Sequence, residues 1–452
     1  MNDSKDIPTV GVSGQDAGHR TPSLKTATGV WAKIGLLSFG GPAAQIALMH
    51  RMLVEERQWL TEKQYLNALS FCMLLPGPEA MQLATYAGWR MHGVMGGLIA
   101  GLLFVLPGAL VILALAMIYV TFGQTPLLDS VFLGIKAAVL VIVVEALLRV
   151  AKKALNGSVF WWIAVLSFVG IFFLALPYPL IVLLAALMGF SMAERKAAVM
   201  NRRSSPDTKE VSSTVSHFRH TLPTTLVTVL VWLGIWILPL LIIDHWLNVS
   251  ILGEIGSFFS RLAVVTFGGA YAVLAYMGQE VVSQFGWLDA GEMMDGLGLA
   301  ETTPGPLILV TEFVGFLAAY RQGGIGLGLA GAAVTLWVTF VPCFLWIFAG
   351  APHIEWICQQ PRLKGALSGI SAAVVGVILN LSLWFSLHVM FADVNQKQVG
   401  PFFLWSPDLA TLDWRVVLLT VVCAITLFRL RWSIPTTLVV SALLGVGMTH
   451  LS

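Results

Sequence analysis

Apolar residues fill this chain in long blocks, separated by short polar stretches or by stretches rich in glycine and proline. At about 1.5 Å of helix per residue, the longer blocks approach or exceed the roughly 30 Å hydrocarbon core of a bilayer. We therefore predict membrane-spanning helices at residues 94–121, 126–150, 158–176, 178–193, 221–246, 325–350, 365–391, 412–430 and 432–451.

Shorter apolar pieces surround glycine and proline breaks in both halves of the chain. A piece of about 15 residues forms only about 22 Å of helix, which is too short to cross a bilayer. We predict that these pieces are half-helices, arranged either as re-entrant pairs or as broken spans. They lie at residues 29–39, 42–57, 61–75 and 79–92, and again at 251–267, 270–284, 288–303 and 307–321.

Composition excludes several classes of protein. Of the 452 residues, 57% are hydrophobic and only 11% are charged, whereas soluble domains carry about 25% charged residues. These proportions exclude a soluble enzyme and a disordered chain. A net charge of +2 gives no nucleic-acid footprint. The four cysteines form no Cys-x-x-Cys pair and the chain has no Walker A motif, so we predict no metal, no cofactor and no enzymatic activity.

Lysine and arginine positions indicate the orientation of the chain. The polar stretches 1–28 and 194–220 are predicted to be a cytoplasmic tail and a cytoplasmic linker. With the N-terminus inside and the short pieces re-entrant, 20 of the 26 lysines and arginines fall on the cytoplasmic side. This asymmetry follows the positive-inside rule.

An internal repeat relates the two halves of the chain at an offset of 228 residues. KIGLLSFGGP at 33–42 aligns with RLAVVTFGGA at 261–270, and Pro-Gly-Pro at 76–78 aligns with Pro-Gly-Pro at 304–306. Trp59-Leu60 matches Trp287-Leu288 at the same offset. We name residues 38–42 and 266–270 the first and second glycine breaks, and residues 76–78 and 304–306 the first and second proline loops.

One extra helix at 221–246 separates the halves and turns the second half over relative to the first. We therefore predict an all-α polytopic membrane protein made of two inverted repeats, 29–193 and 250–452. Inverted repeats with broken helices are typical of secondary transporters, which hold their substrate near the bilayer midplane between the breaks.

The breaks are candidates for an anion site. Glycine permits a left-handed backbone, and a helix that begins at a break presents unpaired N–H groups and the positive end of its dipole. Such helix ends bind anions, so we predict a small-oxyanion site. The alternative is that the breaks are kinks filled by neighbouring helices. The candidate residues are Ser38, Gly40, Gly41, Pro76, Gly77, Pro78, Gln82, Thr266, Gly268, Gly269, Pro304, Gly305 and Pro306.

Two cations strengthen this prediction. Lys33 and Arg261 occupy equivalent repeat positions inside apolar runs, and charges within a membrane mark functional sites by default. Together they would match a dianion, whereas the alternative is that they snorkel to an interface. Each lies five residues before Ser38 or Thr266, about 140° around a helix, so the side chains share a face only if the helix unwinds.

Other charged residues carry less specific signals. Lys136 is a third candidate cation, with a salt bridge to a carboxylate on another helix as the alternative. Glu79 follows the first proline loop and is a candidate for proton coupling, or else a first-turn glutamate stabilised by the helix N-terminus. Glu301 and Glu312 bracket the second proline loop and leave the same two interpretations open.

The paired glycine breaks and proline loops resemble those of the chromate ion transporter family in its long, two-domain form, over about residues 25–193 and 250–450. Ala270, where the first half has Pro42, departs from the pattern and makes the two breaks inequivalent. The resemblance implies a multi-pass protein of the bacterial inner membrane that exports chromate and confers chromate resistance.

The expected partners are therefore chromate, the lipid bilayer and a second copy of the chain in a homodimer. The residues alone imply only a small oxyanion, so uptake or exchange of sulfate stays open as the alternative. An intramembrane enzyme or an assembly factor would need a catalytic cluster, and the sequence offers none.

Overall fold

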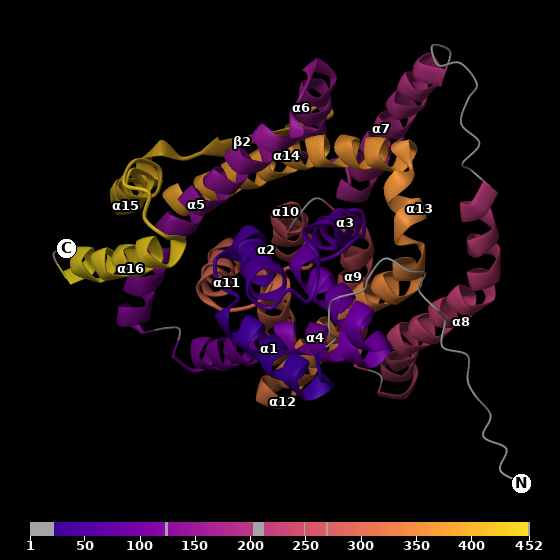
Figure 1. Cartoon of the computed structure of the whole chain (residues 1–452). Helices are drawn as coiled ribbons and strands as arrows, with labels where there is room; N and C mark the ends of the chain where they lie inside the picture. The colour runs from indigo at the N-terminus through magenta and orange to yellow at the C-terminus, as the bar shows by residue number, and fades with distance from the viewer. Residues whose placement is uncertain (1–21, 123–124, 202–211, 248, 268–269, 451–452) are drawn as a thin grey trace, which may run out of the picture.

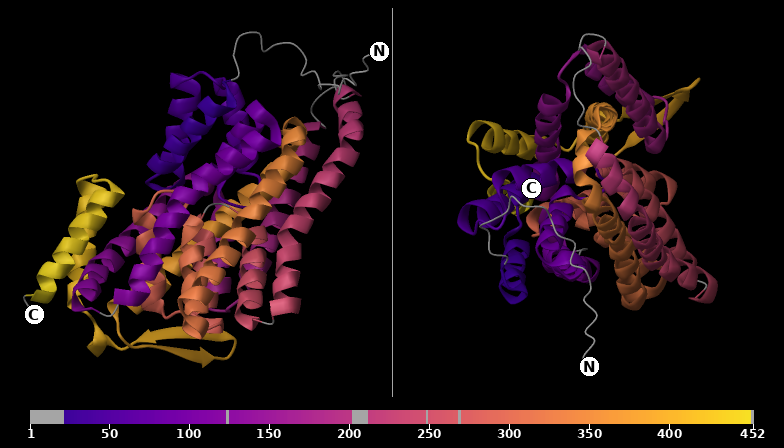
Figure 2. Two further views of the ribbon diagram at one scale, coloured as in Figure 1. Left: turned by 90° about the horizontal axis from the view of Figure 1, so that it is seen from below. Right: turned by 45° about the vertical axis from the view of Figure 1, so that its right-hand side comes forward.

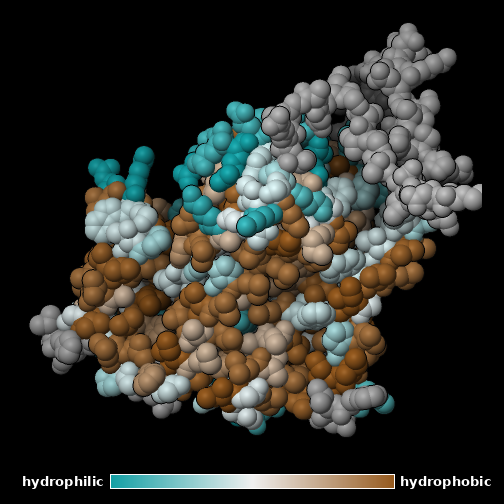
Figure 3. All heavy atoms as spheres, turned by 60° about the horizontal axis from the view of Figure 1, so that its bottom comes forward, coloured by the Kyte–Doolittle hydropathy of each residue, from teal (hydrophilic) through white to brown (hydrophobic). Residues whose placement is uncertain are grey.

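The computed structural model describes residues 22–122, 125–201, 212–247, 249–267 and 270–450. Helices dominate this part of the chain and pack side by side as a bundle (Figures 1 and 2). A broad hydrophobic band covers the face seen in Figure 3, and hydrophilic residues gather mainly at its upper end. This surface fits a multi-pass membrane protein.

The described part of the N-terminal half contains seven α-helices, whose positions follow the predicted blocks. They are α1 (Leu24–Leu37), α2 (Gly41–His50, continued by a π-helical turn at Arg51–Glu56), α3 (Glu62–Cys72), α4 (Glu79–Phe122), α5 (Pro126–Ala154), α6 (Ser158–Phe172) and α7 (Tyr178–Asn201).

The C-terminal half begins with the predicted extra helix and then repeats the pattern of short helices. Its elements are α8 (Ser212–Ile242), α9 (Ser250–Val265), α10 (Ala270–Gln279), α11 (Ala290–Thr302), α12 (Val310–Gly350), α13 (Ile354–Gln359), α14 (Pro361–Met390), β1 (Val394–Val399), β2 (Phe402–Pro407), α15 (Trp414–Ala424) and α16 (Ile434–His450).

The longest helix of each half is a hairpin. In α4 the backbone leaves the helical region at His92 and Gly93, and Gly88 lies against the backbone of Gly96. The arms 79–91 and 94–122 therefore run antiparallel and in contact. The breaks expected between the apolar pieces 79–92 and 94–121, and between 307–321 and 325–350, are confirmed, since α12 breaks in the same way at residues 323–324.

Within the described ranges, five segments are long and apolar enough to cross a membrane: Glu79–Phe122, Pro126–Ala154, Pro223–His245, Leu307–Gln359 and Pro361–Met390. The Pro223–His245 segment, which contains most of the extra helix α8, packs mainly against α12, and only 6% of its most apolar window is buried. α14 is the best-packed C-terminal span, because glycines such as Gly369 and Gly376 let α7 and α6 approach its backbone closely. Small residues serve the same purpose in other membrane bundles.

Two features go beyond the predicted all-α fold. β1 and β2 form an antiparallel hairpin with Val399 opposite Phe402, turning at Gly400 with φ of 62°. The hairpin lies across one end of the bundle (Figure 2). In addition, α7 continues to Asn201 and α8 begins at Ser212, so helices extend into the stretch predicted as a linker.

Candidate functional site

The glycine breaks and proline loops of the two halves meet in pairs. The N–H of Gly77 donates to the carbonyl oxygen of Thr266 at 2.8 Å, and the N–H of Gly305 donates to the carbonyl oxygen of Ser38, also at 2.8 Å. These four residues are two repeat-related pairs. Each proline loop is therefore fastened to the glycine break of the opposite half.

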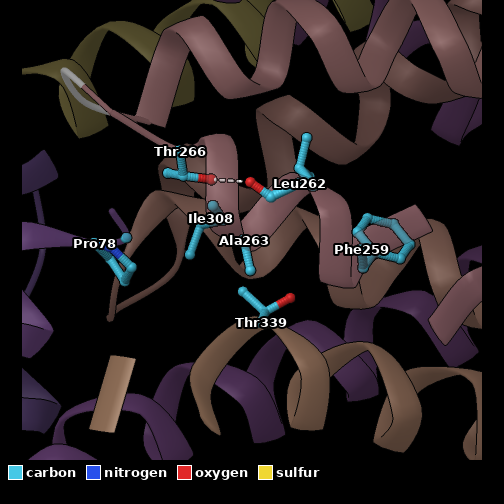
Figure 4. Close-up of a pocket in the computed structure, with 8 residues that line it drawn as sticks. Pro78, Phe259, Leu262, Ala263, Thr266, Ile308 and Thr339 are labelled. Carbon is cyan, nitrogen blue, oxygen red and sulfur yellow. Dashed lines mark hydrogen bonds between the residues drawn. The ribbon is translucent and has the colours of Figure 1, made fainter. Parts of the chain in front are cut away.

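Ser38 and Thr266 end their helices in the same way. The hydroxyl of Ser38 donates to the carbonyl of Ile34 at 2.6 Å, and the hydroxyl of Thr266 donates to the carbonyl of Leu262 at 2.6 Å; the second bond is drawn in Figure 4. Both side chains are buried. Because each hydroxyl hydrogen is already engaged, both residues position the breaks in this structure and are not poised to donate to an anion.

Glycine is required where the chain turns. Gly40 and Gly41 have φ of 84° and 78°, a left-handed region that side chains disfavour. Gly77 has φ of 123°, and a Cβ there would lie 2.8 Å from the sulfur of Cys343 and 2.8 Å from Nε2 of Gln82. Gly268 and Gly269, predicted to act in the same way, lie outside the described residues.

One cavity adjoins the first turns of four helices. Its free volume is about 20 Å³, which is room for about one water molecule, so it must widen to admit a larger anion. Pro42 comes from α2, Glu79 from α4, Ala270 from α10 and Leu307 from the 3₁₀ turn that leads into α12. The other lining residues are Gln45, Gly77, Pro78, Ala80, Thr266, Pro306 and Ile308. We call this space the central cavity.

Gln45 is the polar side chain of the central cavity that sequence reasoning missed. It is 1% exposed, and its amide nitrogen donates to the carbonyl of Gly305 at 2.6 Å and to that of Ser38 at 3.2 Å. Its amide oxygen is buried without a partner. The available signal was a polar residue inside an apolar half-helix, although its repeat mate is Val273.

Gln82 braces the first proline loop. Its amide nitrogen donates to the carbonyl of Pro76 at 2.7 Å, and the side chain is fully buried. Its amide oxygen has no partner. Gln82 does not line the central cavity, so in this structure it shapes the loop.

Lys33 and Arg261 lie on the outer faces of α1 and α9. Both are exposed, whereas Ser38 and Thr266 are buried, as expected for residues about 140° apart on an unbroken helix. Neither cation lines the central cavity. Arg261 instead lines a separate open groove between α8 and α9, near Asp244. The structure therefore does not bring the two predicted cations to the glycine breaks.

Lys136 forms a salt bridge within the bundle. Its ammonium lies 3.2 Å from Oδ1 of Asp295 on α11, and the hydroxyl of Tyr119 donates to Oδ2 of the same carboxylate at 2.9 Å. Asp295 is 4% exposed. The alternative considered for Lys136, a salt bridge to a carboxylate on another helix, is therefore correct.

The remaining acidic candidates are placed differently. Glu79 lines the central cavity. Glu301 is buried and accepts a hydrogen bond from the hydroxyl of Tyr271 at 2.7 Å. Glu312 is buried with no hydrogen-bond partner for either carboxyl oxygen.

Comparison with known proteins agrees with this arrangement. The chain matches the family described as "Chromate transporter" over residues 26–190 and 253–446, which cover both glycine breaks and both proline loops. No solved structure shows significant similarity to the chain.

Three curated relatives have similar lengths. A "Probable chromate transport protein" of Synechococcus elongatus is 30% identical over 80% of this chain and 84% of its own. A "Chromate transport protein" of Cupriavidus metallidurans is 30% identical over 79% of this chain and 81% of its own, and one of Pseudomonas aeruginosa is 33% identical over 76% and 77%. With the family match extending over both halves, the chain belongs to the chromate transporter family.

Proposed function

We propose that this chain exports chromate from the cytoplasm as a secondary transporter and that the central cavity is its anion site. The observation that carries the proposal is the convergence of four helix starts on one cavity. Each helix start carries about +0.5 elementary charge, so the four supply about +2, which matches a tetrahedral dianion. Among the described residues, no lysine or arginine lines the cavity, so backbone N–H groups would carry the recognition.

The hydrogen bonds between the halves support the two-repeat interpretation. The hydrogen bonds Gly77–Thr266 and Gly305–Ser38 join equivalent positions of the repeat in opposite order, and both are 2.8 Å long. An inverted repeat accounts for this arrangement if each half contributes one glycine break and one proline loop to a shared midplane site. On this proposal residues 29–193 and 250–452 are the two repeats, α8 connects them, and the N-terminus lies in the cytoplasm of a bacterium.

Chromate is the substrate favoured by the names of the relatives in Cupriavidus metallidurans and Pseudomonas aeruginosa. Export needs no nucleotide, because a membrane potential supplies about 2.3 kcal/mol per charge per 100 mV. For a dianion leaving an inside-negative cell this amounts to about 4.6 kcal/mol per 100 mV. The lack of a Walker A motif is consistent with such a mechanism.

Glu79 is the ionisable side chain of the central cavity and would repel an anion in its charged form. We propose that it binds a proton when the anion enters, so that chromate and the proton occupy the cavity together. The repeat mate of Glu79 is Leu307 on the same cavity, so this function belongs to one half only.

Flux into and out of proteoliposomes tests the proposal. The full chain is reconstituted, and chromate movement is followed while the membrane potential and the pH gradient are set separately. We expect chromate to move toward the positive side, with sulfate as a weaker competitor. If sulfate moves inward and chromate only competes with it as an analogue, the uptake alternative is favoured. If no anion moves at all, the proposal is contradicted.

A further inference from the structure

Glu312 is a buried carboxyl group that the proposed anion site does not use. It lies in the first turn of α12 and is 1% exposed. Both of its carboxyl oxygens are buried, and neither has a hydrogen-bond partner. Its repeat mate is Ala84, so the repeat does not require an acid at this position.

The described charged groups on the elements that pack against α12 do not pair with Glu312. On α4, Glu79 lines the central cavity and Arg90 is exposed. On α11, Asp295 pairs with Lys136 and Glu292 pairs with Arg321. On α9, Arg261 and Glu254 are exposed. Asp244, in the π-helical turn Ile243–Leu247 that follows α8, faces the groove beside α9. Glu301, also on α11, is bonded to Tyr271. Among the described residues, no charged group interacts with Glu312.

Burial without a partner decides the protonation state of Glu312. A carboxylate ion in an apolar interior loses its hydration and gains nothing in return, whereas the neutral acid avoids this penalty. In the conformation described here, Glu312 therefore holds a proton.

A polar group on the second arm of α12 lies beside the central cavity. A second, smaller cavity shares Gly77, Pro78, Thr266 and Ile308 with the central cavity and extends to Thr339 on α12. Figure 4 shows Thr339 across this space from Ala263, with Pro78 on another side. The hydroxyl of Thr339 is buried and has no partner.

Thr339 and Glu312 lie on opposite arms of the α12 hairpin. Gly315 on the first arm lies against Gly331 and Thr335 on the second. Glu312 and Thr339 both lie beyond this contact, away from the turn at residues 323–324. The structure thus has an unpaired hydroxyl in the wall of the cavity and an unpaired acid on the opposing arm.

We propose that Glu312 is a proton-binding site that is loaded and emptied through Thr339 from the cavity, and that its proton moves with the anion. This inference rests on the proposed function. In the step, the O–H bond of the Glu312 carboxyl breaks, the proton passes to cavity water, and the carboxylate that remains takes up a proton in the next cycle. The charged carboxylate disfavours an anion nearby, so the proton and the anion leave together and the exported charge falls from −2 to −1. The membrane potential still favours export, with half the effect that it has on the dianion alone.

The first test is independent of transport. Infrared spectra of the purified full chain at neutral pH are compared for wild type and Glu312→Gln. We expect wild type to show the carbonyl band of a protonated carboxylic acid that the variant lacks. Glu194→Gln, which changes an exposed acid paired with Arg362, is the control and should leave that band in place. A band unaffected by Glu312→Gln would overturn the protonated state, whatever the protein transports.

The second test measures coupling. Proteoliposomes carry chromate across an imposed pH gradient while the membrane potential is held at zero. We expect the wild-type flux to change by about fivefold or more between opposite gradients, in the range typical of coupled sites. We expect Glu312→Gln to change less than about twofold, and Glu301→Gln to behave as wild type. Glu312→Gln with full sensitivity to the gradient would overturn the coupling.

Thr339→Val covers the case in which Glu312→Gln does not fold. It preserves the shape of the side chain and removes only the hydroxyl. We expect the carbonyl band of Glu312 to remain while the response of flux to the pH gradient becomes weaker or slower. An unchanged response in Thr339→Val would overturn the route through Thr339.

Discussion

The backbone N–H of Gly77 donates to the carbonyl oxygen of Thr266 at 2.8 Å, and this bond joins the first proline loop to the second glycine break. The bond from Gly305 to Ser38 joins the other loop and break at the same distance. The two halves of the chain are therefore interlocked at the cavity. Neither half can complete the lining of the cavity without the other.

Gly77→Ala tests whether this interlock needs glycine. An added Cβ would meet both Cys343 and Gln82 at 2.8 Å, and φ is 123°. Strain of this kind costs about 1–3 kcal/mol, so we expect a lower melting temperature in detergent and a loss of most chromate flux. Gly234→Ala on α8, where a Cβ meets nothing within 4 Å, is the control and should leave both measurements unchanged.

Gln45→Leu tests the second connection between the halves. The amide of Gln45 donates to the carbonyls of Ser38 and Gly305, and the substitution leaves buried acceptors with fewer donors. Such losses cost about 1–3 kcal/mol. Gln82→Leu is the comparison, since the amide nitrogen of Gln82 donates to the carbonyl of Pro76 in its own proline loop. We expect Gln45→Leu to lower chromate affinity more than Gln82→Leu; equal effects would contradict a special function of the cavity amide.

Lys33→Ala and Arg261→Ala test whether cations or helix ends hold the anion. Both side chains are exposed and outside the lining of the central cavity. Charges that do not contact the ligand act mainly through a screened field, so we expect chromate affinity to fall by less than about tenfold in equilibrium binding. Complete loss of chromate binding in both variants would support the predicted anion site formed by the two cations.

The breaks in the helices were predictable from the sequence because their causes are local. Clustered glycines and prolines favour helix ends, so the short helices and the hairpin turns at residues 92–93 and 323–324 follow from the local sequence, although single prolines such as Pro107 and Pro342 lie inside helices. The 140° argument likewise anticipated that Lys33 and Ser38 would point in different directions.

The contacts between the halves could not be predicted, because they join residues far apart in sequence. Lys136 was expected to bind an anion or to pair with an unnamed carboxylate, and only the packing of α5 against α11 identifies that partner as Asp295. The contacts of Gln45 could not be predicted either. Its repeat mate is Val273, and one of its two partners, Gly305, lies in the other half of the chain.

His50 gives a pH-dependent prediction at a group outside the candidate spans. Its hydrogen bond to Glu62, with the charges of Glu62 and Glu55, raises the pKa of His50 above 6.5. A raised pKa stabilises the fold below the unfolded value, and this stabilisation is lost as pH rises through the folded value. We expect amide protection at the connection between α2 and α3, taken relative to the intrinsic exchange rate at each pH, to fall as pH rises from about 6 to about 8. His50→Gln should abolish that dependence; its persistence would assign the effect to another group.

Asp295→Asn and Lys136→Met test whether the buried ion pair is structural or part of coupling. Either change leaves one charged partner in the bundle. Breaking a buried pair lowers the free energy of unfolding by about 3–5 kcal/mol. We expect a smaller loss here, because the Lys136 side chain is 25% exposed. Glu194→Gln, which breaks an exposed pair with Arg362, should cost at most about 1 kcal/mol.

The double variant Lys136→Met with Asp295→Leu removes both charges. We expect it to be more stable than either single variant, because no unpaired charge remains, and melting temperatures of the four proteins measure this directly. If the double variant also moves chromate with the wild-type response to a pH gradient, Lys136 only holds α5 against α11. If the double variant is stable but its chromate flux no longer responds to the pH gradient, the pair takes part in proton coupling, because the loss of the response cannot then be due to unfolding.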